Sequence, residues 1–360
     1  MRLRRLTVRG FRNLADADLA IPEGGLVLFG ANGQGKTSLL EAVAYPVLFR
    51  SFRTAQDAEV VRFGEAGFTV ALDFEAGGTR RAVASGFWVA GRRRRHSLDG
   101  APLARVVDGT GAWLAVAFLP HDVRLAGGPA AERRQFLDRT LSLADPRYLR
   151  ALARYRSALA RRNAALRQRR GDVARAFEGA LARAGAVVVA TRLAWVAGRR
   201  ERFTREMIAL GETGAEASLG YQGDAALADP DAWPAALDAA RARDEAQGAT
   251  TVGPHRHDVE LRLDGHPLRE FGSAGQQRTA AIALKLLELD TIEAAAGETP
   301  VLLLDDTFAE LDADRQARLA VRLFAKRSVQ VLVTSPRADE LPPGLDLPVW
   351  VVERGKVRCG

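Results

Sequence analysis

The chain has 360 residues, a formal charge of +8 and 47% apolar residues, a composition typical of a globular protein large enough for two domains. No uncharged apolar run approaches the roughly 18 residues of a membrane span, and the basic N-terminus lacks the apolar segment of a signal peptide. The lone Cys359 excludes an internal disulfide and a cysteine-rich zinc site, so we expect a cytoplasmic protein with no membrane partner.

The first predicted element with chemical content is a short buried strand, Leu26–Phe29, that runs into a glycine-rich turn and then a helix. The turn matches G-x-x-x-x-G-K-[ST], in which backbone N–H groups surround phosphates. We expect Lys36 to reach the β- and γ-phosphates and Thr37 to bind Mg²⁺. A glycine turn that binds nothing is disfavoured, because both flanking elements are present. The predicted nucleotide-binding residues are Gly30, Ala31, Asn32, Gly33, Gln34, Gly35, Lys36, Thr37 and Ser38.

Residues 129–248 have a helical pattern and a strong basic bias. Leucines seven positions apart predict one long helix that pairs with a second, and Arg162 and Arg169 interrupt that seam. Arg147 to Arg175 contains ten arginines and one acid, so partners four residues away are missing. Arginine-rich codon usage or a solvated face would also explain this, but we favour contact with duplex phosphates. The candidate DNA-binding residues are Arg150, Arg154, Arg161, Arg162, Arg169 and Arg170.

A second basic cluster, Arg92 to Arg95, falls in a predicted hairpin before an Asp99-Gly100 turn. It suits DNA and solvent equally well, and the sequence leaves both open.

Towards the C-terminus, alternating residues 259–263 and an Asp264-Gly265 turn predict another hairpin, followed by a helix. Ser273, Gly275 and Gln276 then stand at a helix N-terminus, where they bind an anion or simply cap the helix.

The apolar strand Val301–Leu304 ends in two carboxylates. A carboxylate at this position holds Mg²⁺ in P-loop proteins, so Asp305 is the expected metal partner. Asp306 is next along the chain and is the candidate for orienting or deprotonating the attacking water. With Lys36, these two residues are the predicted catalytic set; a solvated acidic turn is the weaker alternative.

Two of these segments resemble known signatures. S-A-G-Q-Q resembles the signature motif of ABC-type ATPases, and LLLDDTFAELD resembles their Walker B strand. The resemblance implies that the signature Ser273 and Gly275 of one copy close over the γ-phosphate held by another. The long insertion between the P-loop and the signature motif is similar to that of SMC-like heads and unlike compact transporter subunits.

Further segments narrow the match, namely LTVRGFRN, GANGQGKTSLLEAV, RSFRT, FLPHDVRLAGGPAAERRQFLDR and TTVGPHRHDVEL. They resemble the bacterial RecF family, in the family's order and over essentially the whole chain. His121 and His257 replace expected acidic residues, and Phe52 replaces an expected histidine. The resemblance implies an α/β ABC-type P-loop head with a mixed sheet, formed by residues 1–128 and 249–360, and a helical arm at 129–248.

The resemblance also implies function: an ATP- and Mg²⁺-dependent homodimer that clamps duplex DNA at single-strand/double-strand junctions. With RecO and RecR it would help RecA replace single-strand binding protein, in repair, in replication and in the SOS response. Asp306 is shorter than the usual glutamate, and Thr334 and Ser335 offer no base, so we expect slow hydrolysis. The alternatives are an ABC transporter motor, a GTPase, disfavoured because no N-K-x-D element occurs, and a non-catalytic scaffold.

Overall fold

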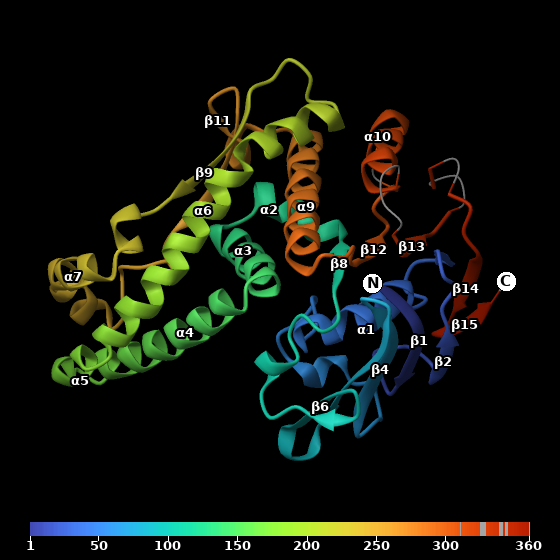
Figure 1. Ribbon diagram of the computed structural model, residues 1–360, viewed down its shortest axis with the longest axis horizontal. Helices are drawn as coiled ribbons and strands as arrows, with labels where there is room; N and C mark the ends of the chain where they lie inside the picture. Colours follow the sequence, from blue (N-terminus) through green and yellow to red (C-terminus); the bar gives the residue numbers. More distant parts are fainter. Residues whose placement is uncertain (310, 325–328, 338–340, 343–344, 360) are drawn as a thin grey trace. The chain divides into compact units, whose positions relative to one another are not determined.

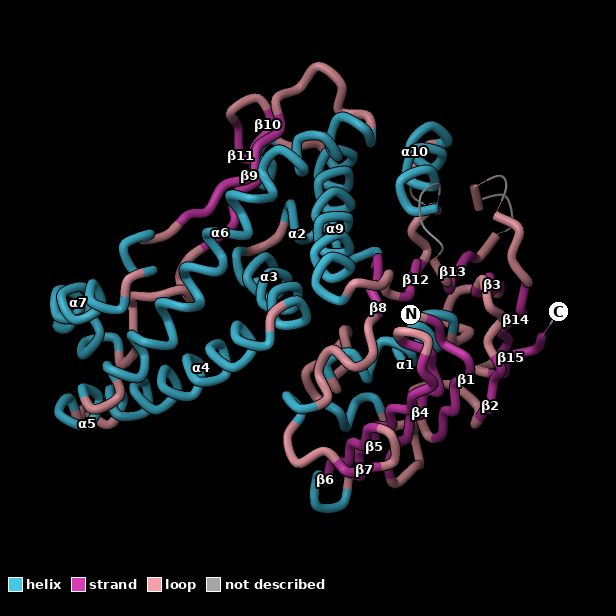
Figure 2. The backbone as a smooth tube through the Cα atoms, viewed as in Figure 1, coloured by secondary structure: helices cyan, strands magenta, loops and turns pink. Residues whose placement is uncertain are grey.

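The chain divides into two units. The computed structural model describes residues 1–309, 311–324, 329–337, 341–342 and 345–359, so Glu310 of the Walker B-like segment lies outside the described residues. Unit 1 comprises residues 1–122 and 288–360, and unit 2 comprises residues 123–287. Strands dominate unit 1 and helices dominate unit 2 (Figures 1 and 2).

Unit 1 contains two six-stranded sheets. The first is antiparallel throughout, with the order β2 (Ala17–Ala20), β1 (Arg2–Arg9), β4 (Gly67–Ala76), β5 (Thr79–Trp88), β6 (Arg93–Leu98) and β7 (Ala101–Pro102). The second is parallel except for its terminal hairpin, with the order β15 (Lys356–Cys359), β14 (Val349–Glu353), β3 (Gly25–Phe29), β13 (Val331–Ser335), β12 (Val301–Asp305) and β8 (Ala115–Phe118).

The second sheet positions the site. Strands β12 and β13 are buried at every residue and β3 at all but its last, because they lie inside a parallel sheet. Their carboxyl ends therefore meet at one edge, where ligands bind in such sheets. Helix α1 (Lys36–Leu48) follows β3 and contacts strands of both sheets, which explains why ten of its 13 residues are buried. Helix α10 (Ala313–Phe324) lies between β12 and β13 in the sequence.

Unit 2 consists of helices and one small antiparallel sheet, in the order β11 (His266–Pro267), β10 (Asp258–Leu263), β9 (Ala217–Gln222). The hairpin turn at Asp264 and Gly265 is confirmed, with both residues at positive φ. The helices are α2 (Arg124–Gly127), α3 (Ala130–Ala144), α4 (Pro146–Arg167), α5 (Gly171–Arg175), α6 (Glu178–Leu210), α7 (Trp233–Gln247), α8 (Leu268–Phe271) and α9 (Ala274–Ala296), whose last turns belong to unit 1.

An α/β head with a mixed sheet and a helical insertion agrees with the sequence prediction, but the division falls elsewhere than expected. We expected the head to resume at residue 249, whereas residues 249–287 belong to unit 2. The physical reason is strand pairing. β10 pairs with β9 over six residues, from Asp258 opposite Gln222 to Leu263 opposite Ala217, so backbone hydrogen bonds fix this segment to the insertion.

The long pair of helices α4 and α6 has the predicted seam, with one correction. Tyr148, Leu152, Tyr155 and Leu166 are buried as expected. Arg162, however, does not end the seam. It is only 1% exposed and binds Asp244 (2.7 Å), Glu178 (3.1 Å) and Thr250 (2.8 Å). These acceptors compensate the charge of Arg162, so its guanidinium can occupy a position where the heptad period predicts an apolar side chain.

Helix α6 is long and apolar enough, by length and composition, to cross a membrane. More than half of the relevant segment (56%) is nevertheless buried within the protein. Its Arg192 is also buried, and donates to Asp138 (2.6 Å) and to the carbonyl of Pro254 (2.7 Å). We therefore interpret α6 as the core helix of unit 2.

His257, at a position where the family resemblance predicts an acidic residue, is buried beside Tyr221. The hydroxyl of Tyr221 lies 2.9 Å from Nδ1 of His257. Burial, reinforced by the charge of Arg192, lowers the pKa of His257 from 6.5 to about 4. The folded state thus keeps this ring neutral, whereas the unfolded chain binds a proton below about pH 6.5.

We predict that acidification from pH 6.5 towards pH 4 lowers the free energy of unfolding, because His257 binds a proton in the unfolded chain and not in the folded one. The loss is at most roughly 3 kcal/mol, and His257 causes none above pH 6.5. Urea unfolding at pH 7 to 4.5 measures this, with His257→Gln as the comparison. Glutamine does not titrate, so the variant should lose less stability on acidification than the wild type. Equal losses in the two proteins would contradict the prediction.

Candidate nucleotide-binding site

The glycine turn between β3 and α1 has the backbone geometry of a phosphate-binding loop. Gly30 has φ 155°, and a Cβ there would lie 2.3 Å from the carbonyl oxygen of Val352. Gly35 has φ 115° and forms the N-cap of α1, with no side-chain cap. Since serine, threonine or aspartate usually occupies this place, the first N–H groups of α1 are left for an external acceptor. This arrangement favours an anion.

Two other segments hold the loop in position. Asn13 donates to the carbonyl of Gly33 (3.0 Å) and accepts from the hydroxyl of Ser38 (2.9 Å). On another side, the backbone N–H groups of Arg354 and Gly355, in the turn between β14 and β15, donate to Gln34 (2.6 and 2.9 Å). The loop is therefore fixed before any ligand binds, which reduces the entropy cost of binding.

The two residues expected to contact phosphate and metal lie at the start of α1. Lys36 is 4% exposed, and its ammonium group donates to the carbonyls of Gly30 (2.5 Å) and Ala31 (3.2 Å). The hydroxyl of Thr37 lies 2.9 and 3.0 Å from the two carboxylate oxygens of Asp305. The structure thus brings together the P-loop and the end of β12, two segments that the sequence analysis could only predict to meet.

Thr334, at the end of β13, completes this cluster. Its hydroxyl lies 2.9 Å from Asp305 and 3.0 Å from Asp306, and it accepts from the N–H of Asp306 (2.9 Å). The sequence pattern indicated only that Thr334 offers no base. The structure adds a role: the side chain is 1% exposed and orients the two aspartates.

Asp305 is buried, and burial raises the pKa of its carboxyl group; the hydrogen bonds from Thr37 and Thr334 oppose that shift. The charge of Asp306 raises this pKa further, and that of Arg53 lowers it. A buried carboxylate beside a hydroxyl is a donor set of hard oxygens, which suits Mg²⁺ better than a softer metal. The residues present therefore fit the metal that the sequence predicts at Thr37 and Asp305.

A buried carboxylate organises the basic side chains of the site. Glu41, on α1, is 0% exposed and accepts from Arg12 (2.6 and 3.0 Å), from Ser51 (2.5 Å) and, at 3.4 Å, from Arg53. Because Glu41 lies one turn after Thr37 on the same helix, it fixes these arginines relative to the loop. The sequence analysis quoted their motifs but assigned neither arginine a role.

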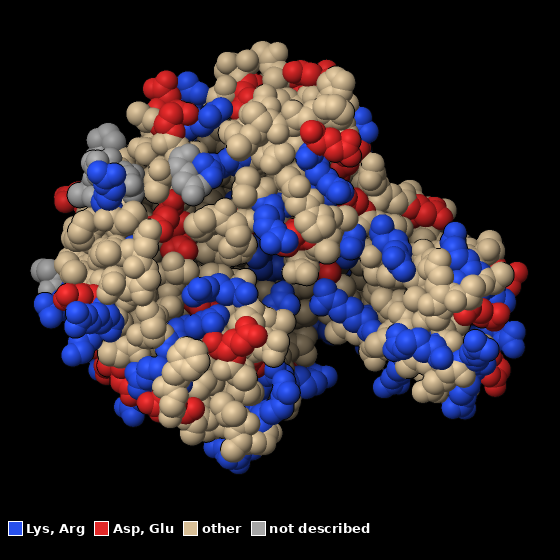
Figure 3. Space-filling model, turned by 180° about the vertical axis from the view of Figure 1, so that it is seen from behind, with Lys and Arg blue, Asp and Glu red and all other residues tan. Residues whose placement is uncertain are grey.

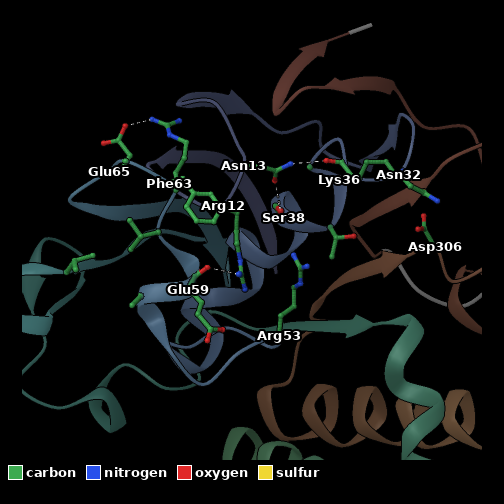
Figure 4. A pocket seen from close by; sticks show the side chains of 18 residues that line it. Arg12, Asn13, Asn32, Lys36, Ser38, Arg53, Glu59, Phe63, Glu65 and Asp306 are labelled. Atoms are coloured by element: carbon green, nitrogen blue, oxygen red, sulfur yellow. Dashed lines mark hydrogen bonds and ion pairs between the residues drawn. The ribbon is translucent and has the colours of Figure 1, made fainter.

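One cavity of about 970 Å³ is lined by Lys36, Thr37, Asp306 and the two arginines that Glu41 holds. Figure 4 shows Arg12, Phe63 and Glu59 on one side and Asn32 and Asp306 on the other. One end holds the P-loop and its cations. The other contains the apolar Val61, Phe63 and Val89, with Glu59, Arg62 and Glu65 beside them. The ring of Phe63 is fully exposed, so it is open to stacking. A cavity with a phosphate-binding loop at one end and an exposed aromatic ring at the other suits a nucleoside triphosphate.

The predicted signature residues lie in unit 2, at the start of α9. Ser273 accepts from the N–H of Gln276 (3.2 Å), and the side chain of Gln276 accepts from the N–H of Ser273 (2.9 Å). This reciprocal pair is a capping box, so Ser273 caps α9. Ser273 is exposed, and its hydroxyl proton is not used by that pair; the anion-binding hypothesis for Ser273, Gly275 and Gln276 therefore stays a prediction.

The candidate DNA-binding arginines fall into three settings. Arg162 is buried in ion pairs, as described above, and we withdraw it. Arg169 and Arg170 are exposed in the turn between α4 and α5. Arg150, Arg154 and Arg161 are exposed along α4 and line a groove with α6. In the second basic cluster, Arg92 to Arg95, Arg94 binds Asp57 (2.5 Å), and Arg95 packs over the ring of Trp88.

Comparison with known proteins gives a consistent result. No protein-family model matches the chain. Curated relatives described as "DNA replication and repair protein RecF" include those of Frankia alni, 37% identical, and Anaeromyxobacter sp. (strain Fw109-5), 38% identical; each alignment covers 99% of both chains.

Solved structures agree with the sequence relatives. Two structures of the recombination mediator protein RecF in the RecFOR pathway, described as RecF-ATPrS and RecF-ATP, are similar over 99% and 100% of this chain and 97% of theirs, with TM-scores of 0.87 and 0.89 and 29% and 28% identity. An Smc head domain from Pyrococcus furiosus has a TM-score of 0.59 and 14% identity, which shows the fold alone. The fold is thus that of an ABC-type ATPase head.

We predict that Phe63→Ala lowers the affinity for ATP about three- to tenfold, the worth of one aromatic stack of about 1 kcal/mol. Phe63→Trp should retain ATP affinity. Binding is measured by calorimetry on the monomer, with inorganic tripolyphosphate as a second ligand. That ligand has no base, so its affinity should not change; parallel losses for both ligands would instead place Phe63 at the phosphate end.

Proposed function

Because the chain belongs to the RecF family of DNA replication and repair proteins, we propose that it is a cytoplasmic ATP-dependent recombination mediator that acts with RecO and RecR. The observation that carries this proposal is the direct contact between Thr37 and Asp305, which assembles the phosphate and metal positions of an ATPase. The full-length match to RecF-ATP supports ATP as the nucleotide.

In the proposed site, the N–H groups of the loop and Lys36 hold the triphosphate, and Arg12 and Arg53 add positive charge at the cavity wall. Mg²⁺, held by Thr37 and Asp305, would neutralise phosphate charge when bound. Asp306 lines the cavity and is the residue we propose to orient the attacking water. Its carboxylate is tied to Thr334, which restricts its movement and agrees with slow hydrolysis.

We propose that ATP joins two copies of the chain. The exposed Ser273 and the N-terminus of α9 in one copy would bind the γ-phosphate held by the other, since the capping box leaves a hydroxyl proton to donate. Dimer formation then depends on the triphosphate, and hydrolysis releases the pair. In this scheme ATP acts as a timer for DNA binding, and activity towards DNA does not require rapid turnover.

Duplex DNA at single-strand/double-strand junctions is the proposed substrate of the dimer. Arg169 and Arg170 are its proposed contacts in the arm, because both are exposed in the turn between α4 and α5 and have no ion pair within the part of the chain that the structure describes. Such contacts depend on salt and carry no sequence information. RecA loading onto DNA coated with single-strand binding protein would follow from this positioning.

The alternative, an ABC transporter motor, predicts a membrane protein as the partner. ATP-dependent retention of duplex DNA, but not of membrane proteins, on immobilised chain separates the two.

We predict that Lys36→Met lowers ATP affinity about 10- to 100-fold, because a charged hydrogen bond to phosphate is lost, and abolishes ATP-stimulated DNA binding. Fluorescence anisotropy of labelled gapped duplex, with and without ATP, measures the second effect. Thermal unfolding checks the fold, since Lys36 also bonds two loop carbonyls. If a folded Lys36→Met variant still shows ATP-stimulated DNA binding, the assignment of this site is wrong.

A second prediction concerns the dimer. Ser273→Arg should leave ATP binding to the monomer unchanged within about twofold but prevent ATP-dependent dimers in sedimentation velocity, because an arginine fills the space of the γ-phosphate. Ser273→Asp keeps an N-cap and should fail equally, since its charge repels phosphate. Ser273→Thr should dimerise. Normal dimers with arginine or aspartate would refute contact in trans.

A further inference from the structure

A groove in unit 2 goes beyond the proposed function. It runs between α4 and α6 and encloses about 630 Å³. Its floor is apolar and built from small residues, among which Ala151, Ala158 and Ala184 are buried. Phe177 and Val187 line the α6 side. Small side chains at helical spacing leave the two backbones accessible from outside, a shape that admits a third helix.

Arginines form the walls of this groove. α4 contributes Arg147, Arg150, Arg154 and Arg161, and α6 contributes Arg183. All five are exposed, and within the described residues none has a carboxylate partner. Figure 3 shows basic side chains spread along the helical part of the molecule. The sequence analysis missed Arg183, because its helix is mainly apolar.

Other arginines of the same helices behave differently. Arg156 and Arg192 bind Asp138 (2.7 and 2.6 Å), and Arg162 binds Asp244. Acids of unit 2 thus pair with the buried Arg162 and Arg192 and with the exposed Arg156, whereas the groove arginines have no carboxylate partner within the described residues. The buried pair of Arg162 and Asp244 also fixes α4 against α7, so the groove exists without a ligand and its occupant need not form it.

We propose that the groove docks an acidic amphipathic helix of a partner protein. Arg147 to Arg161 spans 14 positions, which is about 21 Å along α4, or some four turns of a docked helix. Carboxylates on the flanks of that helix would pair with the arginine walls, and its apolar stripe would cover the alanine floor.

Duplex DNA matches only half of this surface. Its hydrated phosphates would contact the arginine walls, as we first expected for Arg150, Arg154 and Arg161, but would leave the apolar floor unfilled. A merely solvated arginine face, in turn, requires neither a hollow nor an apolar floor. The acidic helix is the occupant that satisfies both features together.

The test uses the full chain and a labelled synthetic 16-residue peptide, a helix-forming sequence with a leucine stripe flanked by glutamates. A control peptide has the same composition in permuted order and lacks the stripe. Anisotropy should show at least tenfold weaker binding of the permuted peptide. Arg154→Glu/Arg183→Glu should weaken binding of the designed peptide at least tenfold. Arg200→Glu/Arg205→Glu, the same charge change outside the groove, should alter it less than twofold.

Two floor variants separate peptide from nucleic acid. Ala180→Trp and Val187→Glu change exposed positions in the groove and should each weaken peptide binding at least fivefold. Binding of a 30-base-pair duplex should change less than twofold in Ala180→Trp. Far-UV circular dichroism checks folding. If one of the two variants does not fold, the other alone is enough to test the groove. Equal binding of both peptides, or peptide binding that ignores the floor, overturns the proposal; duplex binding that requires the groove arginines, without peptide binding, assigns the groove to DNA.

Discussion

The structure depends on one contact, that between the hydroxyl of Thr37 and the carboxylate of Asp305, which joins residues 268 positions apart. It forms because β3, β13 and β12 are neighbours in a parallel sheet whose carboxyl ends share an edge. The middle strand supplies Thr334, which orients both aspartates. If that strand order were different, the P-loop and the carboxylate of Asp305 would belong to separate surfaces.

A second organising element is the buried Glu41. A carboxylate removed from water needs strong compensation, and Arg12 and Arg53 provide it from two different loops. Their charges are thereby held beside the phosphate position, while α1 places Lys36 and Thr37 one turn earlier. The same helix thus carries the ligand-binding residues and the residue that positions the surrounding charge, so the nucleotide site is rigid before ATP arrives.

Arginine serves two opposite purposes in unit 2. Arg162 and Arg192 are buried, and each joins segments distant in the sequence through acids. Arg154 and Arg183 are exposed and uncompensated within the described residues, and they line the groove between α4 and α6. This division explains how a chain with so many arginines keeps a stable helical arm: Asp138 and Asp244 lie where burial makes an unpaired charge most costly.

The sequence by itself determined the P-loop, the aspartates after β12, the start of α9 and the α/β class, because each depends on local backbone geometry or on short periodic patterns. It also identified the RecF family, through motifs spread over the whole chain. Only the tertiary structure decided which residues surround the nucleotide. Phe63 and Arg12 line the candidate cavity and come from segments beside β4 and β1, whose proximity is set by strand pairing.

Burial decided the remainder. Periodicity could not distinguish Arg162, buried by Asp244 from α7, from Arg161, its exposed neighbour, because the difference depends on a partner 82 positions away. Residues 249–287 belong to unit 2 for a similar reason. β10 pairs with the distant strand β9, and no local sequence pattern predicts that partner.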